Sequence, residues 1–195
     1  MLRLVAYTAR SFLTERPVPF GCAIYTTKTG HLLLQARNAV APQSDPTAHA
    51  EVRAIRLATR RLRTLSLAGY TLYTTCEPCP MCMSAALWAG LDRVVYGASI
   101  AQCNRHCRQI QISAREVARR SDMSCSITGP LCSDACYALF THPVMLRAFR
   151  SWSTSRTTTR RSTGSVSSLK QKVAVGKMTA DANSKSHSGA KRAKA

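Results

Sequence analysis

The sequence predicts an α/β domain in which helices cover a sheet. Within the first 150 residues, β-branched and apolar runs alternate with segments of helical periodicity. Two of these runs, residues 70–75 and 93–97, are separated by one short helical segment, and such a crossover implies a parallel strand pair. The chain has 195 residues, 45% of them apolar, which is long enough for one buried core and too short for two ordinary domains.

The first half of the chain is expected to hold an N-terminal amphipathic helix, a hairpin and a long helix. Residues 20–27 and 31–37 are apolar and β-branched, and the glycine-containing turn between them predicts a β-hairpin. Residues 47–64 follow Asp45, which suits an N-cap, and Pro46, which suits the first helical position. Their apolar residues recur on one face, so we expect a helix.

In the second half, residues 70–75 form a strand, residues 80–89 a buried helix stopped by Gly90, and residues 93–97 a further strand. The remaining expected elements are helices at residues 113–120 and 134–140 with a short strand at residues 126–129 between them. Residues 101–112 show no pattern that predicts an element.

The composition changes near residue 150, so we divide the chain into a domain over residues 1–150 and a tail over residues 151–195. The tail is rich in Ser, Thr, Lys and Arg, its only aromatic residue is Trp152, and Asp181 is its only acid. Such a segment cannot bury enough apolar surface to offset its ordering entropy, so a disordered basic tail is expected. Because the tail carries nearly half of the formal charge of +19, charge alone is weak evidence for a nucleic-acid partner.

The cysteine content and the N-terminal sequence indicate the cellular compartment in which we expect the protein. Nine cysteines, an odd number in a chain of this size, disfavour a disulfide framework and favour reduced or metal-bound thiols. The N-terminus lacks a secretory signal, and its Arg3, Arg10 and Arg16 fit a mitochondrial presequence less well than a plain amphipathic helix. No apolar run approaches the roughly 20 residues of a membrane helix. We therefore expect a cytoplasmic protein with no membrane partner.

Two short motifs together predict a metal site. Cys79 and Cys82 are three residues apart at the start of a helix, where both thiolates can face one ion. His49, at the start of another helix, supplies a third ligand. Three protein ligands leave the fourth tetrahedral position of a zinc ion to water, the arrangement of a catalytic zinc site. Glu51 is poorly placed as a fourth ligand and well placed to accept a proton from that water.

Each motif also has a structural explanation when it is taken alone. A C-x-x-C pair can be a redox pair or a chance spacing, a histidine can be a core residue, and a glutamate at a helix start can complement the helix dipole. Their joint occurrence, in this order and at helix starts, favours the metal site. Two further groups could make a second metal site, but neither has a paired C-x-x-C, so they are expected to be scattered buried thiols: Cys103, His106 and Cys107, and Cys125, Cys132 and Cys136.

Residues 45–51 (DPTAHAE) and 75–82 (TCEPCPMC) closely resemble the cytidine deaminase-like superfamily, in the branch of guanine deaminases, nucleoside deaminases and bacterial tRNA adenosine deaminases. The resemblance extends over residues 1–149. It implies a three-layer α/β/α sandwich around a five-stranded mixed sheet, one zinc per subunit, and a homodimer. The residues that it implies for the site are His49, Cys79 and Cys82 as zinc ligands, Glu51 as the catalytic residue, and Phe20, Asn38, Ala50 and Pro78 as substrate contacts.

Within that set, Asn38 would bind the base or ribose, the Ala50 amide a ring substituent, and the Pro78 carbonyl the departing amine. For Asn38, the alternative is a turn residue that ends a strand. Cys76, at a strand end, is not expected to be a ligand.

The resemblance implies a hydrolase that converts an exocyclic amine of a purine base or nucleoside to a carbonyl and releases ammonia. The run EPCPMC and Trp88 resemble guanine and nucleoside deaminases, whereas residues 99–107 lack the acidic segment of guanine deaminases. Residues 127–136 resemble tRNA adenosine deaminases, which leaves deamination of the tRNA wobble adenosine as an alternative. A pyrimidine deaminase and a non-catalytic zinc-stabilised RNA-binding protein also stay open, although Glu51 argues against the latter.

Overall fold

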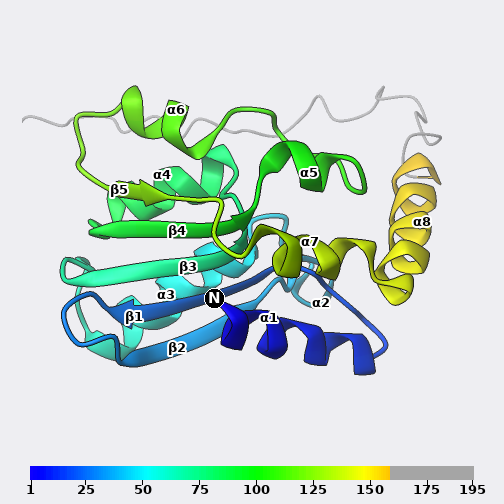
Figure 1. Ribbon diagram of the computed structural model, residues 1–195, viewed down its shortest axis with the longest axis horizontal. Helices are drawn as coiled ribbons and strands as arrows, with labels where there is room; N and C mark the ends of the chain where they lie inside the picture. Colours follow the sequence, from blue (N-terminus) through cyan, green and yellow to red (C-terminus); the bar gives the residue numbers. More distant parts are fainter. Residues whose placement is uncertain (159–195) are drawn as a thin grey trace, which may run out of the picture. The chain divides into compact units, whose positions relative to one another are not determined.

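In the computed structural model, which describes residues 1–158, five strands form one mixed sheet in the order β2-β1-β3-β4-β5 (Figure 1). The strands are β1 (Gly21–Thr26), β2 (Leu32–Arg37), β3 (Tyr70–Cys76), β4 (Arg93–Ala98) and β5 (Ser126–Thr128). β1 is antiparallel to β2 and β3, and β4 is parallel to β3 and β5. The hairpin, the parallel pair and the five-stranded mixed sheet that the sequence predicts are confirmed.

Helices cover both faces of the sheet, which completes the predicted α/β/α sandwich (Figure 1). α3 and α4 pack on one face, α1 and α7 on the other, and α6 packs against α4. The helices are α1 (Leu2–Ala9), α2 (Val40–Gln43), α3 (Ala50–Leu62), α4 (Pro80–Trp88), α5 (Ile100–Asn104), α6 (Ala114–Arg119), α7 (Ser133–Thr141) and α8 (Pro143–Thr158), with a 3-10 turn η1 (Arg10–Leu13). None of these helices within residues 1–158 is both long and apolar enough to span a membrane.

Successive side chains of a strand point to opposite faces of the sheet, so the core consists of two apolar clusters. Cys22, Ile24 and Leu72 point to the α3 and α4 face, where small residues such as Ala54 and Ala58 let α3 lie close to the sheet. The second cluster joins the end of β4 to α7 and α8, and its members include Ala98, Cys136, Phe140 and Phe149. The first cluster thus packs against Leu72 and Val94 near the starts of β3 and β4, and the second against Cys76 and Ala98 at their ends.

The start of α3 differs from the prediction. The helix begins at Ala50 with His49 as its extended N-cap residue, so the assignment of Asp45 as N-cap is wrong. The Asp45 carboxylate instead accepts hydrogen bonds from the Thr47 amide at 2.8 Å and the Thr47 hydroxyl at 2.7 Å. This local turn engages Oδ1 of the aspartate before the helix begins, because Asp readily bonds to the backbone two residues ahead.

Residues 101–112, which showed no pattern, contain most of α5. This helix begins with a capping box in which the Ser99 hydroxyl accepts from the Gln102 amide, and the Gln102 side chain accepts from the Ser99 amide at 2.9 Å. A helix of only five residues is too short for its apolar periodicity to be recognised in the sequence.

At the C-terminal end, α8 continues beyond the expected boundary at residue 150. The Trp152 ring lies edge-on to the Phe149 ring, with centroids 5.1 Å apart, and Trp152 packs on the second apolar cluster. The packed helix therefore includes the first residues of the predicted tail. The remainder of the predicted disordered basic tail, from residue 159 onward, lies outside the described residues.

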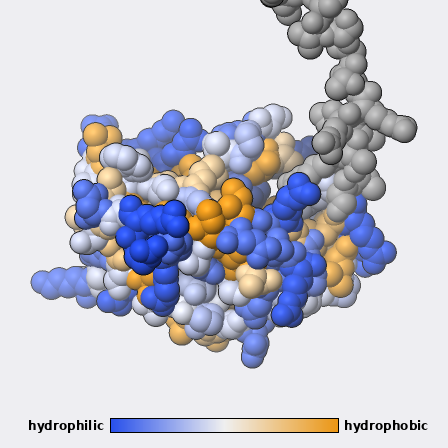
Figure 2. Space-filling model, turned by 90° about the horizontal axis from the view of Figure 1, so that it is seen from above, coloured by the Kyte–Doolittle hydropathy of each residue, from blue (hydrophilic) through white to orange (hydrophobic). Residues whose placement is uncertain are grey.

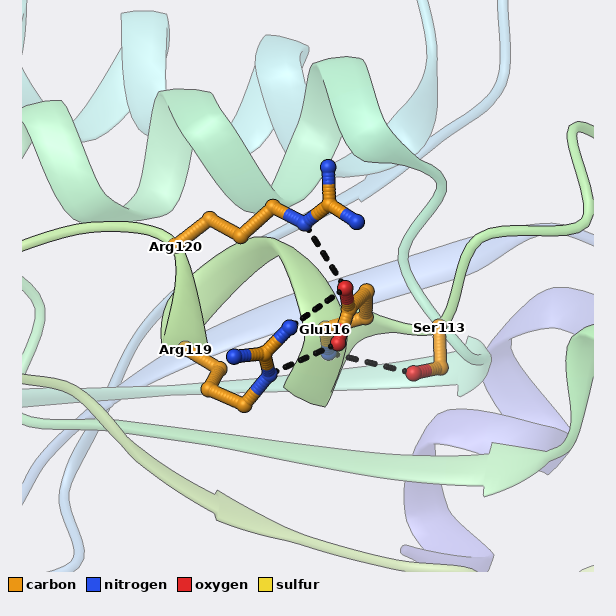
Figure 3. A network of polar contacts seen from close by, with 4 residues as sticks. All are labelled: Ser113, Glu116, Arg119 and Arg120. Atoms are coloured by element: carbon orange, nitrogen blue, oxygen red, sulfur yellow. Dashed lines mark hydrogen bonds and ion pairs between the residues drawn. The ribbon is translucent and has the colours of Figure 1, made fainter.

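The start of α6 carries an ionic network that is expected to make stability depend on pH (Figure 3). The Glu116 carboxylate accepts from the Arg119 side chain in two hydrogen bonds of 2.9 Å and from Arg120 Nε at 2.7 Å, and these contacts lower the pKa of Glu116 to about 2. A depressed folded-state pKa stabilises the fold above the ordinary value of 4.5, and this contribution is lost as the pH falls from there toward 2. We expect Glu116→Gln to lower the free energy of unfolding slightly at pH 6 and progressively less below pH 4.5.

Denaturant unfolding of both proteins between pH 3 and pH 6 measures this difference. Asp122→Asn is the matched control, because Asp122 is exposed and makes no ion pair within residues 1–158. A Glu116→Gln difference that stays constant over the whole pH range would contradict the prediction.

Candidate metal centre

The three predicted ligands meet where two helices begin. His49 is the N-cap residue of α3, Cys79 is the N-cap residue of α4, and Cys82 lies in the first turn of α4. Pro80 occupies the first turn of α4, where its missing N–H has no helical partner to lose. β3 ends at Cys76 and leads directly into α4, so the strand end positions both cysteines beside α3.

The spacing of the three ligand atoms fits a tetrahedral metal ion. His49 Nδ1 lies 3.7 Å from Cys79 Sγ and 3.5 Å from Cys82 Sγ. Zinc bonds of roughly 2.0 Å to nitrogen and 2.3 Å to sulfur place tetrahedral ligand atoms roughly 3.5 to 3.8 Å apart. Within residues 1–158, this is the only group of three or more His, Cys, Asp or Glu side chains with ligand atoms within 4.8 Å of one another.

The electrostatics of the group favour a cation. Hydrogen bonds from the Cys82 thiol, and then from His49, lower the pKa of Cys79 to about 4, whereas the pKa of Cys82 is raised by its bond to Cys79 and by burial. The two sulfurs thus share one negative charge. A divalent ion between them would allow both to ionise, as metal-ligating thiols do.

Glu51 lies next to this group and is shielded from solvent. Its side chain is 5% exposed, Oε1 accepts a hydrogen bond from the Thr74 hydroxyl at 2.9 Å, and Oε2 accepts from the Cys82 thiol at 3.6 Å. Burial raises the pKa of Glu51 above its ordinary value. The carboxyl group is therefore oriented by Thr74 on β3 and is suited to exchanging a proton at the metal site.

Glu77 is a second buried acid, and its role was not predicted from the sequence. Its carboxylate accepts hydrogen bonds from the Ile100 amide and the Ala114 amide, each at 3.0 Å. These amides belong to the first residues of α5 and α6, whose free N–H groups favour a negative charge. Glu77 thereby attaches the loop before Cys79 to two helices. No spacing rule could reveal this, because its partners are more than twenty residues away.

Thr75 performs a similar task for the predicted Phe20 segment. Its hydroxyl donates to the Pro19 carbonyl at 2.8 Å and accepts from the Gly21 amide at 3.0 Å. The Phe20 ring lies edge-on to Phe140, with centroids 5.2 Å apart. Phe20 is thus held between the end of β3 and α7.

The other predicted substrate residues surround the same strand ends. Asn38 follows β2, and its Oδ1 accepts from the Val40 amide at 3.0 Å, so the turn role that the sequence left open is present. The side-chain NH₂ group and the second lone pair of Oδ1 stay available to a ligand. Ala50 is fully buried at the start of α3, where backbone N–H groups lack helical partners. Pro78 is buried between β3 and Cys79.

The remaining cysteines lie away from the three ligands. Cys76 Sγ is 3.0 Å from Cys103 Sγ, so Cys76 contacts α5 and is not part of the ligand group. His106 bonds through Nε2 to the Tyr137 hydroxyl at 2.8 Å. Cys136 is buried on α7, whereas Cys132, the N-cap residue of that helix, is exposed, so the expectation of buried thiols is wrong for Cys132.

Comparison with known proteins agrees with this geometry. The family model of the cytidine and deoxycytidylate deaminase zinc-binding region matches residues 1–98. The chain is 46% identical over 91 residues to tRNA(Ile)-lysidine synthase of Deinococcus deserti, a match that covers 47% of this chain and 17% of that protein. It is 48% identical over 80 residues to guanine deaminase of Bacillus subtilis, which covers 41% of this chain and 50% of that enzyme. The chain thus matches half or less of the length of these two relatives.

Two further matches cover a larger share of the matched protein's own length. A Schizosaccharomyces pombe protein named "Probable cytosine deaminase" is 34% identical over 122 residues, which covers 60% of this chain and 73% of that protein. A solved structure from a study of A-to-I editing by tRNA:A34 deaminases superposes with a TM-score of 0.60 at 26% identity, over 71% of this chain and 96% of that one. The chain belongs to the cytidine and deoxycytidylate deaminase zinc-binding family.

Proposed function

We propose that this protein is a zinc-dependent hydrolytic deaminase that replaces an exocyclic amine of a purine base or nucleoside with a carbonyl and releases ammonia. The observation that carries the proposal is the buried Glu51 carboxyl group beside the His49, Cys79 and Cys82 ligand atoms. A purely structural zinc site has no use for an acid–base group that is desolvated and oriented in this way.

In this proposal, His49, Cys79 and Cys82 hold one zinc ion, and bound zinc supplies a water molecule of lowered pKa. Glu51 would accept a proton from the attacking water and deliver it to a ring nitrogen, and would then take the second proton from the added hydroxyl group and pass it to the departing amine as the carbonyl forms. Thr74 keeps the Glu51 carboxyl group in the orientation needed for both transfers, because its hydroxyl donates to Oε1.

The proposed substrate contacts are those that the family resemblance implies for the groups around the strand ends. The Asn38 amide donates to the base or ribose, the Ala50 N–H binds a ring substituent, and the Pro78 carbonyl accepts from the departing amine. The Phe20 ring supplies an apolar wall. The relative named guanine deaminase supports a purine base or nucleoside as the substrate.

A tRNA adenosine deaminase is the second candidate, and two observations favour it. One is the superposition on the structure from the tRNA:A34 deaminase study, in which the match covers 96% of that structure's chain. The other is the row of exposed arginines on α3, namely Arg56, Arg60 and Arg61, which could contact phosphates. Asp45 pairs with Arg56 at 3.5 Å, so part of this surface is already neutralised.

A homodimer is part of the proposal. Seen from the side of α5 and α6, Figure 2 shows hydrophobic side chains gathered within a mostly hydrophilic face. The connection between these helices exposes Ile110 at 58% and Ile112 at 45%, and Trp88 at the end of α4 is 78% exposed. Apolar surface surrounded by polar residues is typical of protein interfaces.

The test is an ammonia-release screen of the purified zinc-loaded protein. The substrates are guanine, guanosine, adenosine, cytosine, cytidine and an anticodon stem-loop with adenosine at the wobble position. We expect turnover on at least one free purine base or nucleoside. Turnover on the stem-loop alone would identify the tRNA activity, and turnover on cytosine or cytidine alone a pyrimidine deaminase. A zinc-loaded, folded protein inactive on all six would favour the non-catalytic RNA-binding alternative.

A further inference from the structure

A hollow of about 290 Å³ lies at the end of the sheet opposite to the metal centre. Its wall includes Thr71 and Tyr73 near the start of β3, whereas the cysteine ligands follow the end of that strand. At roughly 3.3 Å per residue, Thr71 and Cys76 are roughly 16 Å apart along the strand. Figure 1 shows that α1 begins over the middle of the sheet, so no helix covers these strand ends on this face. The hollow is therefore separate from the proposed active site.

Two arginines from different elements border this hollow. Arg3 lies on α1, Arg93 begins β4, and both are exposed. Within residues 1–158, neither takes part in an ion pair, and no acidic side chain lines the hollow. The neighbouring Asp92 accepts a hydrogen bond from the Gly69 amide at 2.9 Å. The fold thus brings two guanidinium groups without an acidic partner to one concave surface.

The rest of the wall supplies hydroxyl groups and aromatic rings. Thr27 Oγ1 and Thr71 Oγ1 are 3.0 Å apart, and hydroxyls can donate to an anion as well as to each other. The Tyr25 and Tyr73 rings meet edge to face, with centroids 5.3 Å apart and an interplanar angle of 78°. A ligand here would meet charged donors, neutral donors and an apolar surface.

We propose that this hollow binds a small phosphate-bearing molecule. The planar guanidinium group presents paired N–H donors that match two phosphate oxygens, and such charge-assisted bonds are stronger than neutral ones. A dianion would also neutralise the two like charges that Arg3 and Arg93 bring to one place. A metal cation is not a suitable ligand, because the wall holds no carboxylate, imidazole or thiol.

Calorimetric titration of the full-length, zinc-loaded protein tests this proposal, with inorganic phosphate and phenyl phosphate as probes. An ionic strength of about 0.15 M screens non-specific attraction to the basic chain. We expect Arg3→Gln/Arg93→Gln to weaken probe binding by at least about tenfold. Arg108→Gln/Arg147→Gln removes the same charge from exposed positions elsewhere and should change the affinity less than about twofold.

The two probes distinguish the kind of ligand. Tighter binding of phenyl phosphate would identify an aromatic phosphate ester that contacts the tyrosine rings, and equal binding would identify the phosphate group alone as the ligand. Either result supports the proposal if it depends on Arg3 and Arg93. The proposal is overturned if neither probe binds saturably, or if the control double variant weakens binding as much as Arg3→Gln/Arg93→Gln does. Thermal unfolding of both double variants checks that they are folded.

Discussion

Replacement of Glu51 by glutamine is expected to lower turnover by about 10² to 10⁴-fold, the usual contribution of a general acid–base residue, while the zinc content stays the same. Glutamine keeps the size of the side chain and can still accept from the Thr74 hydroxyl, but it cannot take up a proton from water. The measurements are the rate of ammonia release at saturating substrate and elemental analysis of bound zinc.

Glu116→Gln, the same chemical change at a half-buried position on α6 outside the metal centre, serves as the control and should leave turnover unchanged. Full activity of Glu51→Gln would disprove the proposed mechanism. Loss of zinc together with activity would instead make Glu51 a part of the metal-binding group, which the 3.6 Å contact with Cys82 does not predict.

Replacement of Cys82 by serine is expected to weaken zinc binding by at least about 100-fold and to abolish turnover with it. Removing a side chain that hydrogen-bonds to a metal ligand already weakens metal binding by up to about 100-fold, so removing a ligand itself should weaken it at least as much. Cys82 is nearly fully buried at 1% exposure, and serine leaves the other two ligands in place, so the loss would report the missing thiolate.

Competition with a chelator measures the zinc affinity, and cobalt substitution reports thiolate ligation through its absorption spectrum. Cys125→Ser is the control, because Cys125 is half-buried and outside the ligand group. If Cys82→Ser bound zinc as tightly as the unaltered protein, the three-ligand assignment would be wrong.

Most of the sheet could be predicted from the sequence because its elements are local patterns. The β1–β2 hairpin follows from two apolar runs and a glycine turn, and the parallel β3–β4 pair follows from one short helix between two strands. The predicted N-cap residue of α3 was wrong because two local arrangements compete for Asp45. Asp45 bonds to Thr47 within a turn, and His49 becomes the N-cap residue. Both arrangements suit an aspartate, and propensity alone does not choose between them.

The metal ligands are predictable for the same reason. A C-x-x-C pair in a first helical turn and a histidine at another helix start are features of short segments, and only their meeting point depends on the fold. Asn38 shows where such reasoning stops. The sequence allows both a turn residue and a substrate contact, and the bond from the Val40 amide establishes the turn.

By itself, the sequence determined the chemical types of the proposed metal ligands, their order and the helices that carry them, because these depend on neighbours a few residues apart. Only the tertiary structure decided which side chains surround them. Thr74 reaches Glu51 across 23 positions, and Glu77 reaches Ala114 across 37. The meeting of Arg3 and Arg93 at one hollow is of the same kind, because α1 and β4 are brought together only by packing on a shared sheet. Contacts of this range depend on the whole chain's packing, which no local pattern encodes.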